Sequence, residues 1–75
     1  MQKLPRITAD DLTRALAKAG WNVVRQKGSH IQLRHPDKKG RVTVALHAGA
    51  IIKPKTLLGT LNQAGMTVEE LRRLL

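Results

Sequence analysis

The chain has 75 residues, with 14 Lys and Arg against 5 Asp and Glu, which gives a formal net charge of +9 at pH 7. This length allows one domain with a small core, and the charge points to a polyanionic partner. A single Trp without Phe or Tyr excludes an aromatic surface for stacking bases, and the lack of Cys excludes disulfides and thiolate metal sites. No apolar run exceeds three residues, and the first twenty residues lack the apolar centre of a signal peptide, so we expect a cytoplasmic protein that spans no membrane.

The first predicted element is a helix that begins after Thr8. Thr8 is a typical N-cap residue, and Asp10 and Asp11 suit the positive end of the helix dipole. Apolar residues then follow at the spacing of one helix face: Leu12, Ala15, Leu16 and Ala19. Gly20 comes next and is predicted to end the helix in a left-handed conformation.

Three strands are predicted after this helix, over residues 21–27, 30–35 and 41–46. The second and third strands alternate polar and apolar residues, which is typical of strands with one buried face. Gly28-Ser29 and residues 36–40 have the composition of turns, so we expect an antiparallel meander. The residues of the third strand expected to face the core are Val42, Val44 and Leu46.

Two further helices are predicted in the last third of the chain. Pro54 suits the first turn of one helix and Gly65 is predicted to end it, with a shared face of Leu57, Leu61 and Ala64. Residues 67–70 have the spacing of a capping box, which opens a short terminal helix with an apolar face of Val68, Leu71 and Leu75. This order predicts a single α+β domain over residues 1–75, with all helices on one face of the sheet and the other face open to a ligand.

Most of the positive charge is concentrated around the predicted sheet. Between residues 18 and 41 there are seven basic residues against one Asp, a balance of +6: Lys18, Arg25, Lys27, Arg34, Lys38, Lys39 and Arg41 against Asp37. The other acidic residues lie at predicted helix starts, where the helix dipole favours them. We interpret the basic stretch as a phosphate-binding surface, and a solvated face or a contact for an acidic protein is the alternative.

Two histidines are predicted to come close on the open face of the sheet. Directly opposed residues of an antiparallel pair share a face, and a short turn over residues 36–40 leaves two registers. In one register His30 lies opposite His47, and in the other it lies opposite Ala45 with His47 on the diagonal. In both, the imidazoles lie beside polar and basic side chains of the same face: Gln32, Arg34, Arg41 and Thr43.

Two imidazoles in a basic surrounding suit the cleavage of RNA. RNA carries its own nucleophile, the 2′-hydroxyl next to the scissile phosphate, so a neutral imidazole can take this proton and an imidazolium can protonate the leaving oxygen. Lys and Arg can stabilise the charge that develops on the phosphate. This chemistry requires no metal or other cofactor, and the sequence has no cluster of acids or HExxH motif for a metal.

Each of these residues also has a simpler structural interpretation. His30 can be a hydrogen-bonding surface residue at a strand start, and His47 can cap the following loop or contact phosphate. His35 directly precedes Pro36 and is interpreted as part of the turn. Trp21 directly follows a helix end and is interpreted as a core residue rather than a ring for stacking bases.

The chain also contains a set of short strings in a specific order: Gly20-Trp21, Arg25-Gln26-Lys27-Gly28-Ser29-His30, Val44-Ala45-Leu46-His47, Gln63-Ala64-Gly65 and Glu69-Glu70-Leu71. With these strings the chain resembles the HicA toxins, small mRNA interferases of HicA–HicB toxin–antitoxin pairs, over nearly its whole length. The resemblance implies a fold similar to a double-stranded-RNA-binding domain, ribosome-independent RNA cleavage with His30 as catalytic residue, and a cognate HicB-like antitoxin that covers the active site. His47 matches a histidine common at the end of the third strand, whereas Ala45 stands where the family usually has Pro.

The sequence therefore predicts the toxin of a type II toxin–antitoxin system, acting as a metal-independent endoribonuclease on mRNA. His30 is the predicted general acid and base, and His47 is a second catalytic candidate. The predicted RNA-binding residues come from the strands and the turn between them: Lys27, Ser29, Gln32, Arg34, Arg41, Lys38 and Lys39. The alternatives are a non-catalytic double-stranded-RNA-binding module, a diverged inactive toxin homologue, and a protein-interaction domain with an acidic partner.

Overall fold

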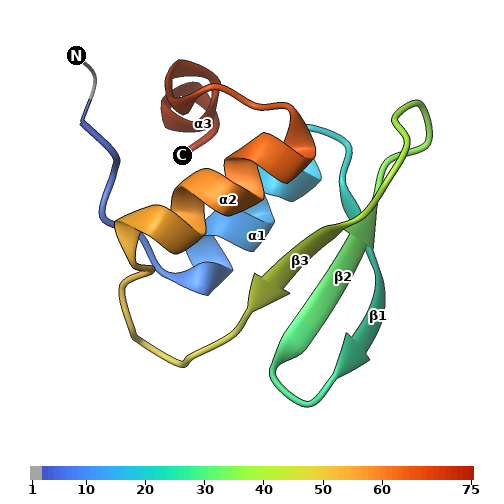
Figure 1. The fold of residues 1–75 in the computed structure, drawn as a ribbon, viewed down its shortest axis with the longest axis horizontal. Helices are drawn as coiled ribbons and strands as arrows, with labels where there is room; N and C mark the ends of the chain where they lie inside the picture. The colour runs from blue at the N-terminus through green and yellow to red at the C-terminus, as the bar shows by residue number, and fades with distance from the viewer. Residues whose placement is uncertain (1–2) are drawn as a thin grey trace.

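The computed structural model describes residues 3–75. The elements follow in the order α1 (Ala9–Lys18), β1 (Asn22–Lys27), β2 (His30–Arg34), β3 (Val42–Ala45), α2 (Pro54–Ala64) and α3 (Val68–Leu74). The strands form one antiparallel sheet in the order β1-β2-β3, and the helices lie together on one side of it (Figure 1). The predicted α+β class, element order and placement of the helices are confirmed. Within residues 3–75, none of the helices has the length and apolar character needed to cross a membrane.

Capping boxes define the starts of α1 and α3. The Thr8 hydroxyl accepts the Asp11 backbone N–H at 3.2 Å, and the Asp11 carboxylate accepts the Thr8 backbone N–H at 3.1 Å. The Thr8 backbone N–H contributes most to holding the pKa of the Asp11 carboxyl below its ordinary value. Thr67 and Glu70 form the same pair of hydrogen bonds at the start of α3. Both predicted N-caps are confirmed, because such caps depend only on residues close in sequence.

One apolar core lies between the helices and the inner face of the sheet. Its largest fully buried side chains come from all three helices, two strands and the α1–β1 connection: Trp21, Leu12, Leu16, Leu33, Leu57, Leu71 and Val42. The burial of Trp21 confirms its interpretation as a core residue. Leu75, predicted on the apolar face of the terminal helix, is 48% exposed. Since α3 ends at Leu74, it is Leu74 that packs against the core.

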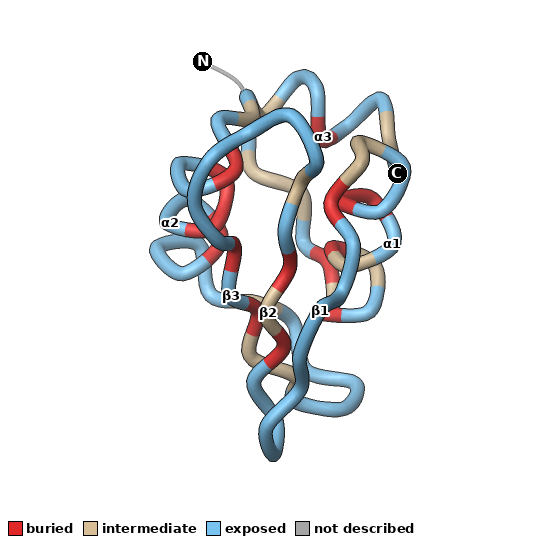
Figure 2. The backbone as a smooth tube through the Cα atoms, turned by 90° about the vertical axis from the view of Figure 1, so that its right-hand side faces the viewer, coloured by how far each residue is buried: buried red, intermediate tan, exposed pale blue. Residues whose placement is uncertain are grey.

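β1 differs from the other two strands in being exposed along its whole length (Figure 2). Val23 and Val24 are 51% and 56% exposed, because α1 and α2 pack mainly against β3 at the other edge of the sheet. The pairing of β1 with β2 shifts between Val23 and Arg25, so Val24 forms a bulge. A bulge on an exposed edge strand hinders edge-to-edge pairing with other chains.

His35 joins the end of α1 to the turn that follows β2. Its Nε2 lies 3.1 Å from the carbonyl oxygen of Ala19, and its Nδ1 accepts the Asp37 backbone N–H at 3.0 Å. The ring also meets Trp21 edge-on, with 5.4 Å between the ring centroids. These contacts confirm the structural interpretation of His35, and they explain why the second strand ends at Arg34, one residue before the predicted end.

Gly20→Ala is expected to destabilise the fold much more than Gly40→Ala. Both glycines have a positive φ, 100° and 86°, so either substitution strains the backbone by about 1–3 kcal/mol. A Cβ on Gly20 would also lie 2.6 Å from Nε2 of His35, whereas nothing lies within 4 Å of a Cβ on Gly40. Urea unfolding followed by circular dichroism measures both variants. Equal losses in the free energy of unfolding would contradict a role for the close contact with His35.

Candidate active site

His30 is the first residue of β2 and lies on the open face between the two neighbouring strands. It pairs with Lys27 of β1 and with Ala45 of β3. The pairing with Ala45 confirms the second of the two predicted registers. His30 is exposed, and its imidazole has no hydrogen-bond partner within residues 3–75. Both ring nitrogens are therefore accessible to a substrate.

The turn Gly28-Ser29 explains how the sequence places this histidine. Lys27 and His30 pair directly, so the two strands are joined by only two residues. Gly28 has a φ of 59°, and a hairpin turn this short needs a positive φ at its first residue, which favours glycine. The Ser29 carbonyl accepts the Leu46 backbone N–H at 2.6 Å, so the end of β3 is held against the same turn.

A second row of polar side chains lies beside His30. Gln32 pairs with Arg25 of β1 and with Thr43 of β3, so these three side chains share the open face. Arg41 donates a hydrogen bond from Nη1 to Oε1 of Gln32 at 3.1 Å, which orients the amide. The amide N–H₂ of Gln32 is thereby left as the donor toward a substrate.

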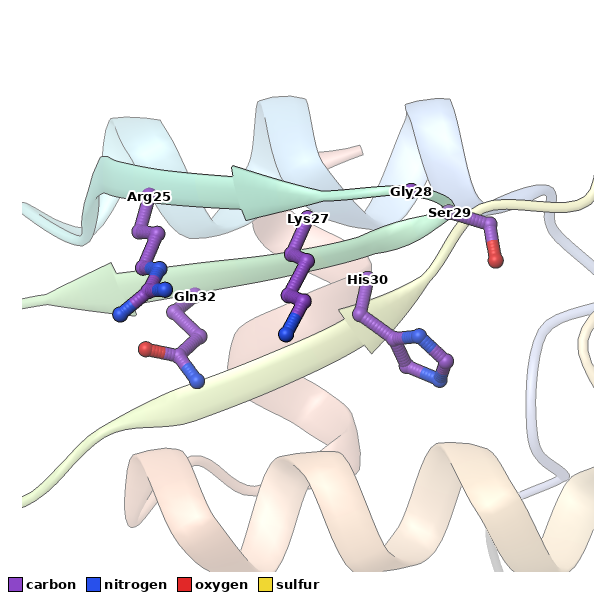
Figure 3. Close-up of a pocket in the computed structure, with 6 residues that line it drawn as sticks. All are labelled: Arg25, Lys27, Gly28, Ser29, His30 and Gln32. Carbon is purple, nitrogen blue, oxygen red and sulfur yellow. The ribbon is translucent and has the colours of Figure 1, made fainter.

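These residues border an open hollow of about 630 Å³, lined by Arg25, Lys27, Gly28, Ser29, His30 and Gln32. Figure 3 shows the side chains of Arg25, Lys27, Gln32 and His30 projecting from the same face, with Ser29 at the turn between β1 and β2. The lining contains two cations and an imidazole but no carboxylate, which is the composition of a phosphate site. Within residues 3–75, no group of three His, Asp or Glu side chains is arranged to hold a metal ion.

The predicted RNA-binding residues fall into two groups in the structure. Lys27, Ser29 and Gln32 border the hollow around His30, and Arg41 reaches it through Gln32. The remaining three predicted residues lie toward the other end of the sheet. Arg34 is at the end of β2, and Lys38 and Lys39 are in the β2–β3 turn.

The β2–β3 turn, which contains Lys38, lies near Glu70 of α3. The pKa of the Glu70 carboxyl is lowered mainly by the backbone N–H of Thr67, and the positive charge of Lys38 adds to the effect. Lys38 is therefore near the start of α3. The structure does not bring Lys38 to the hollow around His30.

His47 lies in the loop after β3 and borders a different hollow. Its carbonyl accepts the Ala50 backbone N–H at 3.0 Å, which turns the chain away from the sheet. The second hollow, of about 330 Å³, is lined by His47 together with Ala45 and residues 50–53, among others. The two histidines are thus neighbours through Ala45, but they do not line one common hollow.

Arg25 belongs to the predicted basic stretch but was not among the predicted RNA-binding residues, and the structure places it in the hollow around His30. It precedes Lys27 by two positions, and strand alternation puts such residues on one face. This spacing could have identified Arg25 as a neighbour of Lys27 on the open face. The bulge at Val24 does not disturb it, because Arg25, Gln26 and Lys27 all pair regularly with β2.

Comparison with known proteins gives a family for the chain. A family model described as the HicA toxin of bacterial toxin–antitoxin systems matches residues 9–66, a range that contains α1, the whole sheet and α2. A comparison with individual curated proteins gives no match. The matched range includes His30 and every residue that lines the hollow around it. Since the match covers most of the chain, the protein belongs to the HicA toxin family.

Proposed function

We propose that this HicA toxin is a metal-independent endoribonuclease that cleaves mRNA at the hollow around His30. The observation that carries the proposal is an exposed imidazole, without a hydrogen-bond partner in residues 3–75, in a hollow whose charged side chains are the cations Arg25 and Lys27. HicA toxins as a family are RNases, which supports the same chemistry here. Because mRNA is the proposed substrate, the cytoplasm is the proposed location.

In the proposed reaction the RNA supplies the nucleophile. The neutral imidazole of His30 takes the proton of a 2′-hydroxyl while the O2′–P bond forms. The P–O5′ bond breaks, and the imidazolium returns the proton to the leaving O5′. The products are one fragment with a 2′,3′-cyclic phosphate and one with a 5′-hydroxyl. No step needs a metal ion, since a nucleophile and a proton carrier are both present.

The cations of the hollow stabilise the charge that develops during this reaction. Lys27 pairs directly with His30, and Arg25 lies two residues along the same strand. Both can approach the non-bridging oxygens of a phosphate held at His30, where negative charge increases in the transition state. The more distant basic residues would hold flanking phosphates along the sheet: Arg34, Arg41, Lys38 and Lys39.

We also propose that a HicB-like antitoxin covers this face of the sheet. The open face is exposed and rich in cations, so a partner that neutralises it must present acidic or hydrogen-bond-accepting groups toward Arg25 and Lys27. Such a partner would block access of RNA to His30. The family assignment supports this pairing, since HicA toxins belong to toxin–antitoxin systems.

The chemistry of the cut ends tests the proposed function. We expect the purified protein to cleave a transcript in the presence of a chelator, leaving 2′,3′-cyclic phosphates and 5′-hydroxyl ends, which end-specific labelling and mass spectrometry identify. Loss of cleavage on chelation would contradict the metal-independent mechanism. Intact RNA after long incubation, with binding that weakens steeply as salt rises, would indicate a non-catalytic binding module instead.

A further inference from the structure

We infer that the hollow beside His47 binds one nucleobase of the RNA, next to the phosphate held at His30. The inference rests on the proposed function for the identity of the ligand. It gives His47 a role in base recognition, separate from the proton transfers of His30. This hollow shares no lining residue with the hollow around His30 and differs from it in composition.

Ala45 relates the second hollow to His30. It is the direct partner of His30 in the sheet and also lines the hollow beside His47. The hydrogen bond from Leu46 to Ser29 holds the last part of β3 close to the turn that positions His30. The second hollow is therefore bordered by the direct strand partner of His30, and we place the base of a nucleotide whose phosphate lies at His30 in it.

The size and the walls of the second hollow suit a base. Its volume of about 330 Å³ is near the low end of the range of about 300–1,000 Å³ for small-molecule sites. Its walls are mainly aliphatic, formed by Ala45, Ala50, Ile51 and Ile52. A base can pack its flat face on such walls. The single aromatic residue, Trp21, is buried in the core and offers no ring for stacking.

Polar groups border the same hollow where the edge of a base would need them. His47, Lys53 and Thr56 line it, and none of these side chains has a hydrogen-bond partner within residues 3–75. Together they offer an imidazole, an ammonium and a hydroxyl, which can pair with ring nitrogens and exocyclic oxygens. No carboxylate lines the hollow, so nothing in it repels the neighbouring phosphates.

The outer wall of this hollow is held by contacts to the N-terminal segment. Ile52 donates its backbone N–H to the Ile7 carbonyl at 2.9 Å, and Ile51 forms an isolated antiparallel bridge with Thr8. Thr8 is itself fixed as the cap of α1. The wall is therefore formed before a ligand binds, which lowers the entropy lost on binding.

The test uses probes that the protein does not need to cleave. Amide chemical shifts of the wild-type chain are recorded during titration with inorganic phosphate and with the 3′-monophosphates of the four ribonucleosides. We expect all probes to shift residues 27–32, and only the nucleotides to shift Ala45, Ile51 and Thr56. The preferred nucleotide should bind about 10-fold more tightly than phosphate, the effect of one or two additional hydrogen bonds to the base. Identical shift patterns for phosphate and all four nucleotides would overturn the inference.

A matched pair of variants locates the base. Ala50 and Ala48 are both exposed residues of the same loop, but only Ala50 lines the hollow in question. Ala50→Phe should fill the hollow and remove the affinity difference between nucleotides and phosphate, whereas Ala48→Phe should preserve it. Equal behaviour of the two variants would also overturn the inference. If base-dependent shifts persist but RNA is not cleaved, the proposed function fails and the base site stands.

Discussion

His30→Ala is expected to lower the rate of RNA cleavage by about 1,000-fold or more while leaving the fold unchanged. A positioned acid and base contributes about 10²–10⁴-fold to such a reaction, and the proposal assigns both proton transfers to this imidazole. The side chain is exposed and has no hydrogen-bond partner within residues 3–75, so its removal should cost the fold little. Initial rates on a labelled transcript and the thermal unfolding curve measure the two effects separately.

His47→Ala is the matched control for this prediction. His30 pairs with Ala45 across the sheet and His47 follows Ala45 by two residues, but only His30 borders the hollow with Arg25 and Lys27. We expect His47→Ala to change the preference among cleavage sites and to slow cleavage only several-fold. A wild-type rate for His30→Ala would refute its catalytic role. A loss of comparable size in both variants would assign the second proton transfer to His47.

The parts of the fold that the sequence predicted correctly are those set by local interactions. Thr8, Pro54 and Thr67 define helix starts through hydrogen bonds or backbone angles within one turn, so their positions can be recognised without knowledge of the fold. The strand bounds were predicted to within one residue: β1 begins one residue later, β2 ends one residue earlier, and β3 is shorter by one residue at both ends. The β2–β3 register remained open between two pairings, because the sequence does not show the path of the turn over residues 36–40.

The features that sequence patterns could not reveal depend on contacts between distant segments. One wall of the hollow beside His47 is held by the backbone hydrogen bond from Ile52 to Ile7, and no local sequence pattern indicates such a contact. The spread of positive charge is a similar case. Lys27 and Lys38 lie in one basic stretch of sequence, yet the five residues of β2, at about 3.3 Å each, place them at opposite ends of the sheet.

This separation of the charges leads to a second prediction with a large effect on RNA cleavage. It compares two double variants that have the same net charge. Arg25→Gln with Lys27→Gln removes the two cations of the hollow around His30, whereas Lys38→Gln with Lys39→Gln removes two from the far turn. Each double variant removes two positive charges, so the net charge falls from +9 to +7 in both. Long-range attraction of RNA therefore weakens similarly in both, and a difference between them must come from position.

The expected difference lies in which kinetic constant changes. Loss of the near pair should lower kcat by about 100-fold or more, since these cations act on charge that appears only in the transition state. Loss of the far pair should raise KM several-fold with kcat unchanged, because contacts to flanking phosphates hold substrate and transition state equally. Both pairs of constants come from initial rates at one fixed salt concentration. If the two variants show the same decrease in kcat and the same increase in KM, the basic face acts only through its total charge. The hollow around His30 would then have no electrostatic role of its own.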